Sequence, residues 1–156
     1  MAILFSEDEI VKSSFEIVLL DTNIKIQERN SWVPYKLILK SADKKLEYTK
    51  SQTGTGDFVF ALSPKDEILE LTNSMSELLS VTSKTKYSFE PLEPSFELEI
   101  EKSHKGYSIY IWVDAGNVVS DHYTWDGLGI RFFTTEEKIQ CFIEELKREV
   151  KEYNYA

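Results

Sequence analysis

The chain has 156 residues, of which 42% are hydrophobic and 29% are charged, the proportions of one ordinary globular domain with a sizeable core. Asp and Glu number 27 against 18 for Lys and Arg, which gives a net charge of -9 at pH 7. Such a charge repels nucleic acid and anionic membranes, so it argues against both as partners and favours a basic partner, unless it serves solubility alone.

Cysteine usage and the lack of long apolar segments indicate the cellular location. Cys141 is the only cysteine, so no internal disulfide is possible and a reducing compartment is expected. The N-terminal residues lack the basic start and the apolar run of a secretion signal. No segment approaches the ~20 apolar residues that span a bilayer. The sequence therefore predicts a cytoplasmic protein of one domain, 1–156, without membrane association.

Alternation of apolar and polar residues marks the first part of the chain as an antiparallel meander. The candidate strands are 15–20, 23–28, 33–40, 46–49 and 57–62. Gly54 and Gly56 lie in a loop before the last of these strands. A phosphate-binding loop would lead into a helix N-terminus instead of a strand, so this loop is not predicted to bind phosphate.

Two helices are indicated by their caps and by apolar stripes. Ser63 is the candidate N-cap of the first helix, with Pro64 at the first helical position. Thr134 opens a Thr-Thr-Glu-Glu capping box for the second helix, with Glu137 reaching back. The helices, over about 64–81 and 135–152, should pack on the sheet through their stripes. The stripes are Ile68, Leu71, Met75, Leu78 and Leu79, and then Ile139, Phe142, Ile143, Leu146 and Val150.

The clearest strand pattern in the chain runs from Ser95 to Lys102. Pro91 and Pro94 favour an extended approach to this strand, because each pushes the preceding residue away from helical conformations. The strand residues then alternate between two faces, with Phe96, Leu98 and Ile100 on the apolar one and Glu97, Glu99 and Glu101 on the acidic one. This period of two predicts a strand with one buried face and one solvated face.

A turn at 104–106 folds the chain back into a second strand, 107–113. Tyr110 and Trp112 should point to the same side as the three carboxylates, although packing of Trp112 inside the protein is an equally good interpretation. Further strands are expected over 118–123 and 129–133, with an exposed turn between them. The candidate protein-binding residues on this acidic and aromatic surface are Glu97, Glu99, Glu101, Tyr110, Trp112, Tyr123, Trp125 and Asp126.

No group of residues has the spacing of a catalytic or metal site. His104, His122 and Cys141 are too few and too scattered for a zinc motif. Asp121 and His122 are adjacent in a predicted strand, so their side chains should point to opposite faces. The strand glutamates, about 6.5 to 7 Å apart, are compatible with metal binding or acid/base chemistry, but a solvated face is preferred. We therefore predict no enzyme activity, no cofactor and no metal.

The segments Phe58–Ser63, with the helix that follows, and Leu92–Leu98 span roughly the middle third of the chain. Their order of strand, helix and Glu-Pro strand resembles small bacterial immunity proteins of the WapI-associated (polymorphic toxin) type. The resemblance implies a cytosolic protein without catalysis that binds a toxin domain, often a nuclease. It carries over no toxin-contacting residue.

The predicted fold is one α+β domain, a strongly curved antiparallel sheet of about eight strands with both helices packed against it. The predicted function is neutralisation of a basic, nuclease-like toxin domain by direct non-covalent binding. Two alternatives stay open from the sequence. One is a structural or adaptor domain whose acidity only aids solubility, and the other is a small-molecule-binding domain with a pocket around His122.

Overall fold

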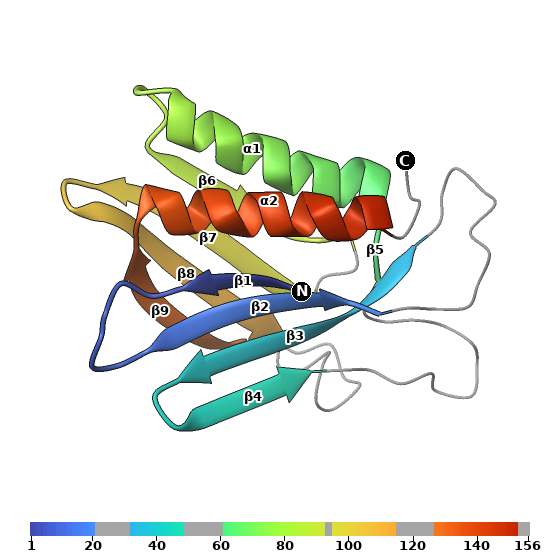
Figure 1. Ribbon diagram of the computed structural model, residues 1–156, viewed down its shortest axis with the longest axis horizontal. Coiled ribbons are helices and arrows are strands. Elements are labelled where there is room, and N and C mark those ends of the chain that lie inside the picture. Colours follow the sequence, from blue (N-terminus) through green and yellow to red (C-terminus); the bar gives the residue numbers. More distant parts are fainter. Residues whose placement is uncertain (21–31, 49–60, 93–94, 115–126, 153–156) are drawn as a thin grey trace.

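The computed structural model describes residues 1–20, 32–48, 61–92, 95–114 and 127–152, which form two antiparallel sheets and two helices. The first sheet contains β1 (Ala2–Phe5), β2 (Ser13–Leu19), β3 (Val33–Ser41), β4 (Lys44–Tyr48) and β5 (Ala61–Leu62). The second contains β6 (Lys86–Phe89), β7 (Phe96–Ser103), β8 (Gly106–Asp114) and β9 (Gly127–Thr134). A helical turn over Pro64–Ile68 leads into α1 (Leu69–Ser80), and α2 (Glu136–Glu152) follows β9. Figure 1 shows α1 and α2 side by side across one side of both sheets.

The first sheet has the strand order β1-β2-β3-β4, with β5 also pairing β3. Its inward face comes from alternate residues, so Phe15 on β2 lies opposite Leu39 on β3, and Ile17 opposite Leu37. All four side chains are buried. The antiparallel meander expected from the alternation is therefore confirmed for these strands.

The second sheet has the order β6-β7-β8-β9, which places the strand with the clearest pattern, β7, between two partners. The β7–β8 hairpin closes with Ser103 opposite Gly106. Gly106 has a φ of 132°, in the region that favours glycine, and a Cβ there would lie 2.6 Å from the carbonyl oxygen of Thr134. Glycine at this position thus allows both the tight turn and the close approach of β9.

Two strands of the structure, β1 and β6, are not predicted from the alternation of apolar and polar residues. The residues of β1 are all apolar and show no period of two, yet Ala2 and Leu4 are buried while Phe5 is exposed. The four residues of β6 alternate, with Tyr87 and Phe89 buried, but so short a run does not stand out from the loop before it. Predicted strands 23–28 and 118–123, and residues 51–60, lie outside the described part of the chain.

The helix starts are close to the predicted ones. Ser63 caps the helical turn before α1, as predicted. For α2 the predicted capping box lies one residue too early, because the Lys138 N–H donates to the Thr135 hydroxyl at 3.4 Å. Thr134 is instead the last residue of β9, and its hydroxyl donates to the carbonyl oxygen of Phe5 at 2.6 Å. This bond joins the second sheet to the edge strand of the first.

One apolar core lies between the sheets and the helices. The ring of Phe96 on β7 lies 5.7 Å from that of Phe15 and 6.0 Å from that of Tyr35, centroid to centroid. Phe15 in turn lies 5.9 Å from Phe142 on α2. The α+β class and the packing of both helices are confirmed, and the strands form two sheets instead of the single predicted sheet.

Candidate protein-binding face

Five of the eight candidate binding residues share the outer face of the second sheet. Glu97 lies opposite Trp112, and Glu99 opposite Tyr110, on the paired strands β7 and β8. Glu101 is two residues further along β7 and therefore points to the same side. The alternation of the sequence thus predicts the shared side correctly, and that this side binds a protein stays a prediction.

Trp112 is exposed on this face. Its exposed fraction is 50%, while its strand neighbours Ile111 and Val113 are fully buried. The alternative interpretation, in which Trp112 packs inside the protein, is therefore wrong. Glu97 and Glu101 are also exposed, whereas Glu99 and Tyr110 are half-buried.

Strands β6 and β9 widen the face with residues that the sequence pattern does not single out. Arg131 lies opposite Tyr110, Gly129 opposite Trp112, and Phe133 is 61% exposed. The alternation of β9 already puts these residues on one side, but the register that brings them beside Trp112 is not visible in the sequence. We define the acidic aromatic face as Lys86, Glu97, Glu99, Glu101, Tyr110, Trp112, Arg131 and Phe133.

The charge of this face is only partly neutralised. The Lys86 ammonium lies 2.7 Å from a carboxylate oxygen of Glu99. That hydrogen bond raises the pKa of Lys86, burial opposes the rise, and the charges of Glu101 and Glu97 add to it. Among the described residues, Glu97 and Glu101 have no ion-pair partner. Within this part of the chain, these two carboxylates are the acidic groups of the face that no cation neutralises by direct pairing.

The indole of Trp112 packs against the backbone of β9. A Cβ placed on Gly129 would lie 2.6 Å from Cε3 of Trp112 and 2.4 Å from the carbonyl oxygen of Ile111. Both distances are shorter than van der Waals contact. Only glycine leaves room for the ring at this position, so Gly129 allows the indole to lie against the backbone of β9.

Gly129→Ala should destabilise the protein by about 1–3 kcal/mol, because the added methyl group must push β9 away from β8 or displace the indole of Trp112. The free energy of unfolding in urea measures this loss. Gly127→Ala is the matched control, because a Cβ there would lie 3.7 Å from Trp112, an ordinary contact. Equal effects of the two substitutions would contradict the close packing described for Gly129.

Three candidate residues, Tyr123, Trp125 and Asp126, lie outside the described part of the chain, as does His122. Their contribution to a binding surface stays a prediction. His104 is described and lies exposed in the β7–β8 turn.

Other kinds of site have little support among the described residues. No group of three or more His, Cys, Asp or Glu side chains there has the geometry to hold a metal ion. A cavity of about 420 Å³ beside the β1–β2 connection is lined by several lysines. Two of these are already paired, Lys40 with Glu16 at 2.5 Å and Lys138 with Glu7 at 2.6 Å. Within the same part of the chain, no helix is both long and apolar enough to cross a membrane.

One known structure similar to this chain is that of the plant transcriptional regulator PBF-2, with a TM-score of 0.44 and 12% sequence identity. The match covers 97% of this chain and 79% of that one. No curated protein sequence matches. The model of the immunity protein WapI-like family matches residues 9–154, so the resemblance seen in the middle third extends over nearly the whole sequence. The chain therefore belongs to the WapI-like immunity protein family.

Proposed function

We propose that this protein neutralises a cognate bacterial toxin by direct non-covalent binding through the acidic aromatic face. Membership of the WapI-like immunity protein family supports a toxin-neutralising role and a protein partner. The observation that carries the choice of face is the half-exposed indole of Trp112, packed against Gly129 on β9 and lying opposite Glu97 on β7. In this proposal the protein acts in the bacterial cytoplasm and catalyses no reaction.

The face combines the two properties that tight protein binding needs. Exposed Trp and Tyr side chains bury a large area at a low entropic cost, and they are frequent hot spots of interfaces. The indole of Trp112 already packs against the backbone at Gly129 in the free protein, which lowers the cost of ordering it when a partner binds. The carboxylates of Glu97 and Glu101 would attract a basic domain and speed association. A nuclease domain fits this charge, because binding of nucleic acid requires basic surface.

Co-expression tests the proposal directly. The probe is the C-terminal domain of a toxin encoded beside the gene for this chain, produced in cells with and without the chain. Restored growth together with a complex that survives purification is the expected result. If growth is not restored and no complex forms, the proposed function is overturned.

Salt dependence separates a specific inhibitor from an acidic adaptor. Exposed charges are screened within about 10 Å at 0.1 M salt, so purely electrostatic attraction to basic proteins fades with added salt. A complex anchored by buried aromatic side chains should persist. Uniform loss of binding to every basic protein at raised salt would favour the adaptor function instead.

Reversal of two charges on the face should slow association with the toxin domain. The double substitution Glu97→Lys and Glu101→Lys should lower the association rate constant about tenfold at low salt, and the difference should shrink as salt rises. Stopped-flow or biosensor kinetics measure the rate. The matched control is Glu70→Lys with Glu144→Lys, two exposed positions on α1 and α2 with the same net change of charge. If the control pair slows association as much, overall charge matters and the face does not.

A further inference from the structure

The loop of residues 6–12, which joins β1 to β2, presents an unusually exposed aliphatic side chain. Ile10 is 94% exposed, and the neighbouring Val11 is also exposed. Isolated apolar residues on a surface need no explanation, but an isoleucine standing almost wholly in solvent at a loop tip gains nothing from the fold itself. The hydrogen bonds and charges of the loop therefore indicate whether Ile10 can serve as a binding contact.

The tip of the loop is held in one conformation by hydrogen bonds. One carboxylate oxygen of Asp8 accepts from the N–H of Ile10 at 2.8 Å and from that of Val11 at 2.9 Å. These two bonds also lower the pKa of Asp8. At the base, the Ser6 N–H donates to the Ser13 carbonyl at 2.8 Å, and the Ser13 N–H donates to the Ser6 hydroxyl at 2.9 Å. The backbone of the loop is thus held both at Ile10 and at the base of the loop.

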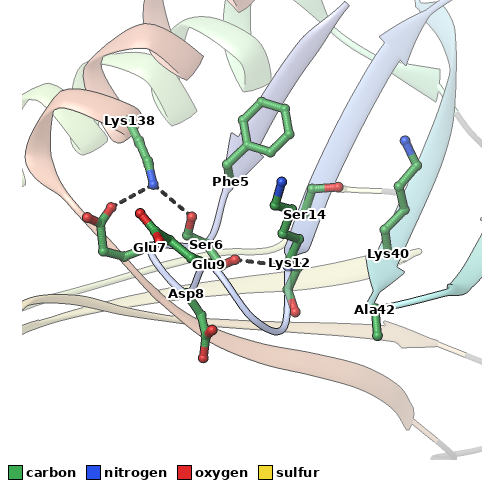
Figure 2. Close-up of a pocket in the computed structure, with 11 residues that line it drawn as sticks. Phe5, Ser6, Glu7, Asp8, Glu9, Lys12, Ser14, Lys40, Ala42 and Lys138 are labelled. Carbon is green, nitrogen blue, oxygen red and sulfur yellow. Dashed lines mark hydrogen bonds and ion pairs between the residues drawn. The ribbon is translucent and has the colours of Figure 1, made fainter.

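Three other elements of the fold anchor the same loop. The Lys138 ammonium from α2 donates to the Ser6 carbonyl at 2.8 Å and to the Glu7 carboxylate at 2.6 Å, as Figure 2 shows. The Ala42 N–H, in the β3–β4 turn, donates to the Lys12 carbonyl at 3.0 Å. The Glu7 N–H donates to the carbonyl oxygen of Phe133 on β9 at 2.7 Å. The last bond connects the loop to the acidic aromatic face, of which Phe133 is a member.

The charges around Ile10 decide between possible partners. Glu7 is paired with Lys138 from α2, which leaves Asp8 and the exposed Glu9 against Lys12 as the charged rim of the loop. An acidic rim repels the anionic surface of a bacterial membrane, so insertion of Ile10 into lipid is disfavoured. The same rim is complementary to a basic protein surface.

We propose that the loop of residues 6–12 is a rigid apolar knob that inserts Ile10 into an apolar pocket with a basic rim on the toxin domain. This inference rests on the proposed function and names a second contact element, adjacent to the acidic aromatic face through Phe133. A preorganised loop loses little conformational freedom when it binds. An aliphatic anchor inside a ring of charge has the layout of an interface hot spot, with a dry centre and a polar rim.

The test measures binding of the neighbouring toxin domain to the full chain and its variants by biosensor kinetics. Ile10→Ala should weaken the complex at least tenfold, mainly through faster dissociation, and Ile10→Asp should weaken it at least a hundredfold. Leu92→Ala is the matched control, because Leu92 is also strongly exposed, at 74%, and lies outside the loop and the face. It should change affinity less than twofold. The melting temperature should not change in any of the three, because none of the removed side chains is buried.

The outcomes separate the two proposals. If the wild-type chain does not bind the toxin domain, both the proposed function and the knob are overturned. If the wild type binds and Ile10→Asp binds equally well, only the knob is overturned. Sedimentation of the chain with phosphatidylglycerol vesicles tests whether Ile10 inserts into lipid instead. Sedimentation of the chain alone tests whether Ile10 contacts a second copy of the chain. Association with either that is lost in Ile10→Asp would also overturn the inference.

Discussion

Replacement of Trp112 with alanine is expected to weaken the complex with the toxin domain by about 2–4 kcal/mol, or roughly 30- to 1000-fold in Kd. The indole is half exposed in the free protein, and its other side is packed against Gly129. A partner that covers the exposed side would bury the ring between two surfaces. Truncation to alanine then removes the buried area of the indole and leaves the partner groups that would contact it without a neighbour. Titration calorimetry measures the loss, and reduced rescue of growth should accompany it.

Two comparisons make this prediction specific. Trp32→Ala removes the same side chain from another exposed position, since Trp32 is 41% exposed and lies outside the acidic aromatic face. Its effect on affinity should be below about 0.5 kcal/mol, the size usual for surface substitutions. Trp112→Phe should recover part of the lost affinity, because a flat aromatic ring remains over Gly129. Equal losses of affinity for Trp32→Ala and Trp112→Ala would show that the acidic aromatic face is not the binding surface.

The strand at 96–103 and its hairpin could be predicted because local rules agree there. The alternation of Phe96 to Glu101 has a period of two over six residues, and the turn at 104–106 has a glycine at the position where φ is 132°. Periodicity and turn chemistry both depend on near neighbours, and such signals are readable without tertiary information. The acidic side of the face follows from the same pattern.

The features that escaped prediction depend on contacts between distant residues. β1 is apolar throughout, so only its pairing with β2 and its contact with α2 show which side is buried. The division of the strands into two sheets is likewise decided by packing across the core. At the candidate face, Arg131 and Phe133 join the glutamates only through the register of β8 with β9. The loop that carries Ile10 is anchored by bonds to β9, α2 and a distant turn, none of which a local pattern encodes.

Phe96→Ala should have the largest effect on stability, a loss of about 3–5 kcal/mol in the free energy of unfolding. Phe96 is 2% exposed, and its ring contacts Phe15 and Tyr35 from the first sheet and Phe89, at 5.9 Å, from the second. The substitution would leave a cavity where the two sheets meet. Since a domain is typically stable by only about 5–15 kcal/mol, much of the stability would be lost.

Phe133→Ala is the matched control for this loss, because it removes the same side chain from the second sheet at a position that is 61% exposed. Urea unfolding should show a change below about 0.5 kcal/mol for this control. Phe96→Leu should fall between the two, since a smaller apolar side chain fills part of the cavity. If Phe96→Ala costs less than Phe96→Leu, or no more than Phe133→Ala, the sheets are not joined through Phe96. The order of the three losses therefore tests the core independently of any toxin, because unfolding is measured on the free protein.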